Sequence, residues 1–244
     1  PALHILLVED SPDNRTITLA YLEDTPYRVE IAENGEIACR KFTAGNYDLV
    51  LMDRQMPVMD GLTATRTIRA WEYANERPPT PIIALTAAAL KGDREKCLAA
   101  GCTAFLTKPI KQEVLLQAIK EHSSVTPAAL PYLVSSVDND SQMDPILQRV
   151  NERLAARIPE YLQNCRENVI TMRDALDRVD FETVTSLGHQ MRGSGGAYGF
   201  QAITDIAAAV EAAAESANND VSRKWVNELS SYLDGIGTDV RIGS

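Results

Sequence analysis

The sequence lacks the features that mark metal-thiolate, membrane and nucleic-acid-binding proteins. Its four cysteines form no C-x-x-C pair and none lies at metal-ligand spacing from a histidine, which argues against structural zinc and favours reduced thiols in a cytoplasmic protein. No apolar run approaches the roughly 18 residues that span a bilayer, and no signal-peptide pattern is present. The formal net charge is −10, and neither half of the chain is basic. We therefore expect no nucleic-acid partner and no membrane contact within this chain.

The first half instead alternates short apolar runs with amphipathic segments. The run Leu49 to Met52 is too short for a stable helix and too apolar for a half-exposed strand, so it predicts a parallel strand buried on both faces. Similar runs predict strands at 3–8, 27–32, 81–85 and 103–106. Helices are expected from Pro12 onward and at 36–43, 62–71, 91–100 and 112–121. Five such units in about 120 residues predict an α/β domain with a doubly wound parallel sheet.

Polar side chains stand where these strands end. They are Glu9 and Asp10 after the first strand, Asp53 after the third, Thr86 after the fourth and Lys108 after the fifth. Because the carboxyl ends of parallel strands border one crevice, we expect these groups to lie together. Three carboxylates this close repel one another unless a cation lies among them, and oxygen ligands suit Mg²⁺. A nucleophilic oxygen, a divalent ion and fixed donors are what phosphoryl transfer requires.

The segments that carry these groups resemble the motifs of response-regulator receiver domains. The matching segments, in order, are Val8–Asp10, Met52–Gly61, Ala84–Ala87 and Thr107–Pro109. The resemblance covers residues 3–121 and implies a flavodoxin-like (βα)5 fold. It implies that Asp53 accepts the phosphoryl group, and that Mg²⁺ is bound by Asp10, Asp53, the backbone carbonyl of Gln55 and, through water, Glu9.

The same resemblance assigns the remaining groups. Thr86 and Lys108 are expected to contact the phosphoryl oxygens, and Lys108-Pro109 to be a cis peptide. Family receivers couple phosphorylation to their surface through the hydroxyl at Thr86 and an aromatic residue on the fifth strand, here Phe105. Phe105 lacks the hydroxyl of a tyrosine, so a switch based on packing is expected.

Two other readings of this half remain open. Each polar residue could be a separate helix cap or turn former. Alternatively, strand-end aspartates with Mg²⁺ and lysine also serve haloacid-dehalogenase-like phosphatases, which use a second Asp two residues after the nucleophile. That position is Gln55 here. In a third view both halves are unphosphorylated docking modules, and Asp53→Asn or His189→Ala would leave signalling unchanged.

The second half is helical in its periodicity. Residues 123–143, rich in proline, serine and aspartate, are expected to form a linker. We then expect a leading helix from Asp144 to about Arg157, and a second from Pro159 with a seam that ends at Val179. Three more helices are expected, one after Asp180, one over 203–214 and one over 221–236. Short connections between them favour an antiparallel bundle of four main helices.

The third of these helices carries the segment of interest. His189 lies about 200° from Met191 around the helix, so we expect it to face solvent, on the same stripe as Arg192, Gly193 and Gly196. Interior glycines cost a helix roughly 1 kcal/mol each, which suggests that bare backbone lets another protein approach. Arg192 would then offset phosphate charge. The alternative is that the helix ends at Gly193 and the glycines form a loop.

The segment His189–Ser194 resembles the central motif of histidine phosphotransfer (HPt) domains, with Arg192 where lysine is more usual. The resemblances imply a receiver domain at 1–122, a linker at 123–143 and an HPt domain at 144–244. They imply a two-component phosphorelay protein in which Asp53 takes phosphate from a histidine kinase and His189 exchanges it with a receiver domain, such as that of a downstream response regulator. The sequence shows no ATP-binding kinase segment and is compatible with the carboxyl-terminal part of a hybrid sensor kinase.

Overall fold

The computed structural model describes residues 2–86, 91–123 and 145–239. It divides into two compact units, Pro1–Val150 and Asn151–Ser244, each of which is described by itself. The expected linker lies almost entirely outside the described residues, so the domain limits given above stay predictions.

The first unit is built on a five-stranded parallel sheet. Its strands are β1 (His4–Val8), β2 (Arg28–Ala32), β3 (Leu49–Asp53), β4 (Ile82–Thr86) and β5 (Ala104–Thr107). Their order in the sheet is β2-β1-β3-β4-β5, with every neighbouring pair parallel. This order confirms the doubly wound, flavodoxin-like sheet. After β2 is added on one side of β1, the later strands are added on the other side, so the topological switch point lies between β1 and β3. All five residues of β3 are buried, as its unbroken apolar run predicts.

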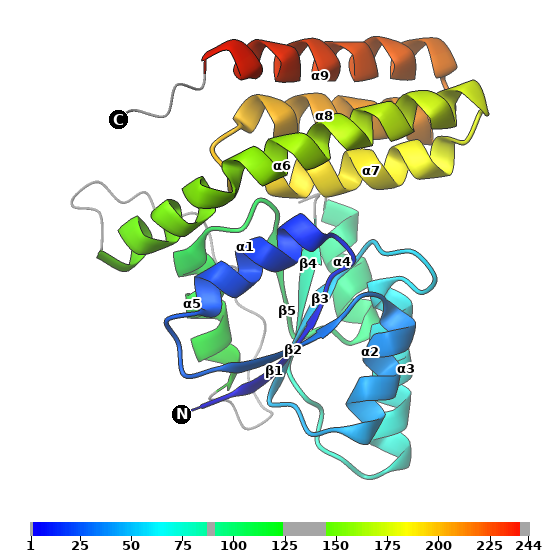
Figure 1. The fold of residues 1–244 in the computed structure, drawn as a ribbon. Coiled ribbons are helices and arrows are strands. Elements are labelled where there is room, and N and C mark those ends of the chain that lie inside the picture. Colours follow the sequence, from blue (N-terminus) through cyan, green and yellow to red (C-terminus); the bar gives the residue numbers. More distant parts are fainter. Residues whose placement is uncertain (1, 87–90, 124–144, 240–244) are drawn as a thin grey trace. The chain divides into compact units, whose positions relative to one another are not determined.

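Helices cover both faces of this sheet. They are α1 (Pro12–Leu22), α2 (Gly35–Ala44), α3 (Gly61–Ala74), α4 (Lys91–Ala100) and α5 (Gln112–Ser123). In Figure 1, α1 and α5 lie on one face, and α2 and α3 lie side by side on the other. Ser11, Asn34 and Asp60 cap α1, α2 and α3, each accepting a backbone N–H three residues on. These caps start each helix directly after a strand-end loop, so the loops stay short.

The described helices of the second unit form an antiparallel bundle (Figure 1). They are α6 (Pro145–Asp177), α7 (Phe181–Ser194), α8 (Gln201–Glu215) and α9 (Asn219–Asp239). The expected break before Pro159 is wrong, because α6 runs through it. Proline there removes the hydrogen bond to the carbonyl of Ala155, and both residues lie at exposed positions where water can hydrate that carbonyl. The buried Leu154 and Leu162 on either side supply packing that offsets the cost.

The seam of α6 is confirmed over most of its length. Leu162, Cys165, Val169, Met172 and Leu176 are all buried. Its expected last member, Val179, is instead exposed because α6 ends at Asp177, and Val179 turns the chain with a φ of 57°.

The end of α7 lies between the two predicted possibilities. The helix continues through Gly193 and ends at Ser194. Gly196 therefore lies in the following turn, where its N–H donates to the Thr204 hydroxyl at 2.9 Å. Gly199 has a φ of 85°, which a residue without a Cβ adopts freely. The glycine-rich segment after His189 is thus a helix end followed by a turn, and of its glycines Gly193 lies within α7.

Candidate functional site

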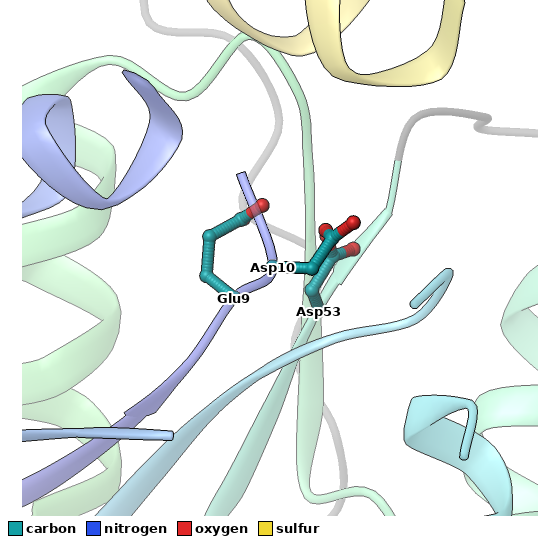
Figure 2. Close-up of side chains that lie close together, drawn as sticks. All are labelled: Glu9, Asp10 and Asp53. Carbon is teal, nitrogen blue, oxygen red and sulfur yellow. The ribbon is translucent and has the colours of Figure 1, made fainter. Parts of the chain in front are cut away.

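The polar strand ends of the first unit meet at one edge of the sheet, as predicted. Asp53 and Thr86 are the last residues of β3 and β4, and Glu9 and Lys108 directly follow β1 and β5. All four are buried. Ligand atoms of Glu9, Asp10 and Asp53 lie within 4.8 Å of one another, and Figure 2 shows these three side chains gathered at the sheet edge. The alternative of unrelated caps and turns does not account for this convergence.

Lys108 joins two of the carboxylates. Its Nζ lies 2.6 Å from Glu9 Oε2 and 2.8 Å from Asp53 Oδ2, and all three side chains are nearly inaccessible to water. Charge-assisted hydrogen bonds this short, in a buried setting, fix the acceptor carboxylate in one orientation. One positive charge therefore partly offsets three acidic groups.

Hydrogen bonds from residues at the start of α1 orient Glu9. Its Oε1 accepts hydrogen bonds from the Ser11 N–H and the Asn14 side-chain amide, both at 3.2 Å. The Arg15 guanidinium donates to the backbone carbonyls of Glu9 and Asp10 at 3.0 and 3.1 Å. The sequence reading did not assign Asn14 or Arg15 to the site, although both lie on the first turn of the helix that follows the two acids.

Close packing also holds the loop after Asp53. The Gly61 N–H donates to the Arg54 carbonyl at 3.0 Å, and a Cβ on Gly61 would overlap the Asp53 carbonyl oxygen. Only glycine permits this approach, which brings the start of α3 against the end of β3. The Gln55 N–H lies 3.4 Å from Asp53 Oδ1.

Burial and repulsion perturb the ionisation of this cluster. Burial, followed by the nearby Asp53 carboxylate, raises the pKa of Glu9 to about 7, even though Lys108 lowers it. Burial alone would lower the pKa of Lys108, but the Asp53 and Glu9 carboxylates raise it above its ordinary value. Lys108 is therefore a permanent cation at neutral pH, whereas Glu9 is only partly ionised without a further positive charge.

This raised pKa predicts how stability depends on pH in the absence of metal. A folded-state pKa of about 7 against an ordinary 4.5 for Glu9 means that its stabilising contribution is full below 4.5 and is lost as pH rises through about 7. We expect the free energy of unfolding to fall by up to about 3 kcal/mol over this window, relative to Glu9→Gln. Urea unfolding of both proteins in EDTA at several pH values measures the difference. Identical pH profiles for the two proteins would contradict this assignment.

The second unit places the predicted histidine differently from expectation. The prediction that His189 faces solvent is wrong, since it is 5% exposed and its Nδ1 lies 3.0 Å from Glu211 Oε1 on α8. The reason is that α7 has a second packed face. At Gly188 the helices approach so closely that a Cβ would lie 3.1 Å from the Glu211 backbone nitrogen and 3.2 Å from the Ala207 carbonyl oxygen. A helical wheel drawn from Met191 alone misses this face.

Glu211 links His189 to Arg192. While one carboxylate oxygen faces the imidazole, the other lies 2.9 Å from Arg192 NH1. Within the described residues, His189 Nε2 is buried with no hydrogen-bond partner. Sequence reasoning missed Glu211, although a signal was present: it stands on the apolar stripe of its helix, four residues after Ala207 and three before Ala214. A carboxylate on a core-facing stripe needs a partner.

Comparison with protein families assigns both units. Residues 5–120 match the family model described as a response regulator receiver domain, and residues 158–239 match that of the Hpt domain. The chain is a receiver domain followed by an Hpt domain. The pocket at the sheet edge belongs to the receiver domain, and His189 with Glu211 belongs to the Hpt domain.

Curated relatives are much longer than this chain. It is 46% identical over 127 residues to hybrid signal transduction histidine kinase B of Dictyostelium discoideum, covering 48% of this chain and 6% of that protein. It is 41% identical over 118 residues to the sensor protein GacS of Pseudomonas syringae pv. syringae, covering 48% of this chain and 13% of that protein. The match thus spans a small part of each relative.

Solved structures match about half of the chain. The receiver domain of a sensor histidine kinase from Pseudomonas aeruginosa, with a magnesium ion coordinated in the active site cleft, is 44% identical, with a TM-score of 0.47; the match covers 51% of this chain and all of that one. A co-crystal structure of a Saccharomyces cerevisiae histidine phosphotransfer signaling protein and the receiver domain of its downstream response regulator gives 33% identity and a TM-score of 0.49. This match covers 50% of this chain and 90% of that chain.

The acidic pocket of the receiver domain fits a divalent cation. Receiver domains generally bind Mg²⁺ at an acidic site, and here Glu9, Asp10 and Asp53 bring hard oxygen ligands within 4.8 Å. Burial and the Asp53 carboxylate raise the pKa of Glu9, and a cation bound beside these carboxylates would oppose that rise. The expected roles of the Gln55 carbonyl and of a water at Glu9 stay predictions.

The remaining receiver residues lie where the motifs place them. The Lys108-Pro109 peptide is cis, as predicted. Phe105 on β5 is half-buried and packs against the core beneath the sheet edge, opposite Ala84 of β4. Its expected part in a switch stays a prediction, as do the contacts of Thr86 and Lys108 with phosphoryl oxygens.

Two general expectations can also be compared with the structure. All four cysteines are free thiols, as their spacing indicated. Within the three described stretches, none of the helices combines the length and apolarity needed to cross a membrane.

Proposed function

We propose that this chain is a phosphorelay component that accepts a phosphoryl group on Asp53 and carries one on His189. The observation that supports this most directly is the pocket in which Lys108 bonds both Glu9 and Asp53 beside Asp10. Asp53 would take its phosphoryl group from the phosphohistidine of a histidine kinase. His189 would give or take one from a receiver aspartate, in this chain or in a downstream response regulator.

The receiver chemistry is a substitution at phosphorus. A carboxylate oxygen of Asp53 forms a bond to phosphorus while the bond from phosphorus to the donor imidazole nitrogen breaks, and that nitrogen keeps the electron pair. Lys108 holds Asp53 in place and offers positive charge to the phosphoryl oxygens as negative charge develops on them. The Thr86 hydroxyl would be a further hydrogen-bond donor to these oxygens. Asp10, Asp53 and the Gln55 carbonyl would hold Mg²⁺, which would supply the remaining charge neutralisation.

The Hpt chemistry depends on which ring nitrogen of His189 is free. A proton on Nδ1 donated to Glu211 leaves the lone pair on Nε2, the nitrogen without a hydrogen-bond partner. We therefore assign Nε2 as the nucleophile and Glu211 as the residue that fixes the tautomer. Arg192, whose NH1 lies 2.9 Å from Glu211 Oε2, would offset charge on a phosphorylated ring.

A phosphatase of the haloacid-dehalogenase type is not favoured. Such enzymes place an aspartate two residues after the nucleophile to hydrolyse the acyl phosphate, and this position is Gln55. The deciding experiment incubates the full chain with acetyl phosphate and Mg²⁺. A relay protein accumulates acid-labile phosphate, up to about one equivalent per site, whereas a phosphatase releases many equivalents of inorganic phosphate per chain. Sustained turnover without stored phosphate would overturn the proposal.

The partners follow from the two chemistries. A histidine kinase would supply the phosphoryl group to Asp53, and a receiver domain of a response regulator would exchange phosphate with His189. We place this exchange in the cytoplasm, which the four free thiols support. The names of the relatives support a place within hybrid histidine kinase signalling.

A further inference from the structure

Val58 stands out in the loop that follows the phosphoryl acceptor. Its φ is 71°, and the Met59 N–H donates to the Pro57 carbonyl at 2.8 Å, so Val58 is the centre of a γ-turn. A γ-turn with a central φ of about +75° is rare and strained, and a β-branched residue suits it least. The side chain is nevertheless 77% exposed. Packing within the described chain therefore does not account for a valine here.

The other non-glycine residues with positive φ have an ordinary explanation. Glu76, Val179 and Ala217 lie just past the ends of α3, α6 and α8. A left-handed residue commonly ends a helix, where it redirects the chain and pairs the last carbonyls. Val58 ends no helix, so its strained conformation serves the loop itself.

Hydrogen bonds hold this loop rigidly against the acceptor. The Gly35 N–H donates to the Met59 carbonyl at 3.1 Å, and the Gly61 N–H donates to the Arg54 carbonyl at 3.0 Å. Met56 and Met59 pack against the core. The loop thus begins and ends beside Asp53, and its inward methionines leave Pro57 and Val58 as its exposed apolar tip.

We propose that Val58 is a contact point for the helical domain that brings phosphohistidine to Asp53. This inference rests on the proposed function. A histidine nitrogen reaches the buried Asp53 carboxylate only if its helix comes down onto the loops that border the pocket, and the loop closed by Gly61 and Arg54 is one of them. A fixed apolar tip at that rim offers such a helix a small surface to bury, without charge to desolvate.

The test compares a protein donor with a small donor. The acceptors are full-length His189→Gln chains that carry Val58, Val58→Thr or Val58→Asn. The protein donor is the full-length Asp53→Asn chain phosphorylated on His189 with phosphoramidate, and the small donor is acetyl phosphate. Threonine keeps the shape and the strained backbone but replaces one of the two methyl groups by a hydroxyl, whereas asparagine accepts positive φ readily.

We expect both variants to slow transfer from the protein donor by about fivefold to tenfold, the factor that losing part of one buried valine contact represents. Labelling by acetyl phosphate should stay within about twofold of the Val58 chain, because that donor needs no protein surface. Val58→Asn should also raise the urea midpoint. Unchanged transfer from the protein donor in both variants would overturn the inference. A Val58 acceptor that no donor labels would instead count against the proposed function.

Discussion

Replacing Asp53 by asparagine is expected to reduce phosphoryl incorporation from acetyl phosphate and Mg²⁺ by at least about 100-fold. The amide has almost the same shape, but it carries no negative charge and presents no nucleophilic carboxylate oxygen. Lys108 bonds Asp53 at 2.8 Å and Glu9 at 2.6 Å, so the variant keeps one of its two partners and the pocket should stay closed. The measurement is radiolabel retained after rapid filtration, with its sensitivity to hydroxylamine as the mark of an acyl phosphate.

Asp60→Asn is the matched control for this substitution. It makes the same chemical change seven residues further along, at the exposed cap of α3, where asparagine caps as well as aspartate. We expect full labelling of this variant. Hydroxylamine-sensitive label that persists in Asp53→Asn would show that another carboxylate is the acceptor.

Replacing His189 by glutamine is expected to remove alkali-stable phosphate completely. Phosphoramidate should label wild-type chain on His189 Nε2, and the P–N bond survives alkali that destroys acyl phosphate. The chain has three histidines, so His122→Gln provides a control that removes an imidazole near the end of α5. Label should survive in this control.

Glu211→Gln separates positioning from nucleophilic attack in the same assay. The amide can still face Nδ1, but it no longer favours the Nδ1–H tautomer, so we expect roughly tenfold slower labelling with the same alkali-stable product. Arg192 also loses its ion pair, so Arg192→Gln is measured beside it. If Glu211→Gln labels at the wild-type rate, the 3.0 Å contact with Nδ1 does not set the tautomer.

The receiver half was predictable from sequence because its signals are local. An apolar run that stops on a carboxylate fixes both the strand and the side chain at its end, as at Leu49–Asp53. Four such strand ends converge without further assumptions, because parallel strands share an edge. What the sequence did not reveal was the pairing inside the pocket. Lys108 bonds Glu9 and Asp53, which lie 99 and 55 residues earlier in the chain, and local sequence patterns do not show such a contact.

The helical half was less predictable because helix faces depend on neighbours. Pro159 predicted a break, but the packing of Leu154 and Leu162 and an exposed turn allow the helix to continue. His189 was assigned to solvent from its angle to Met191, yet α8 covers that direction through the close approach at Gly188. Periodicity within one helix identifies one buried stripe and says little about a second.

The Glu211 carboxylate contacts two side chains at once, the imidazole of His189 and the guanidinium of Arg192. A phosphoryl group on the His189 ring would attract Arg192. The Glu211 carboxylate would then lose the positive charge that Arg192 supplies. The phosphorylated Hpt domain would then be less stable than the unphosphorylated one. This difference in free energy favours transfer of the phosphoryl group to a receiver over its retention on His189. A site that stores phosphate would instead need a cationic side chain that is not already paired with a carboxylate.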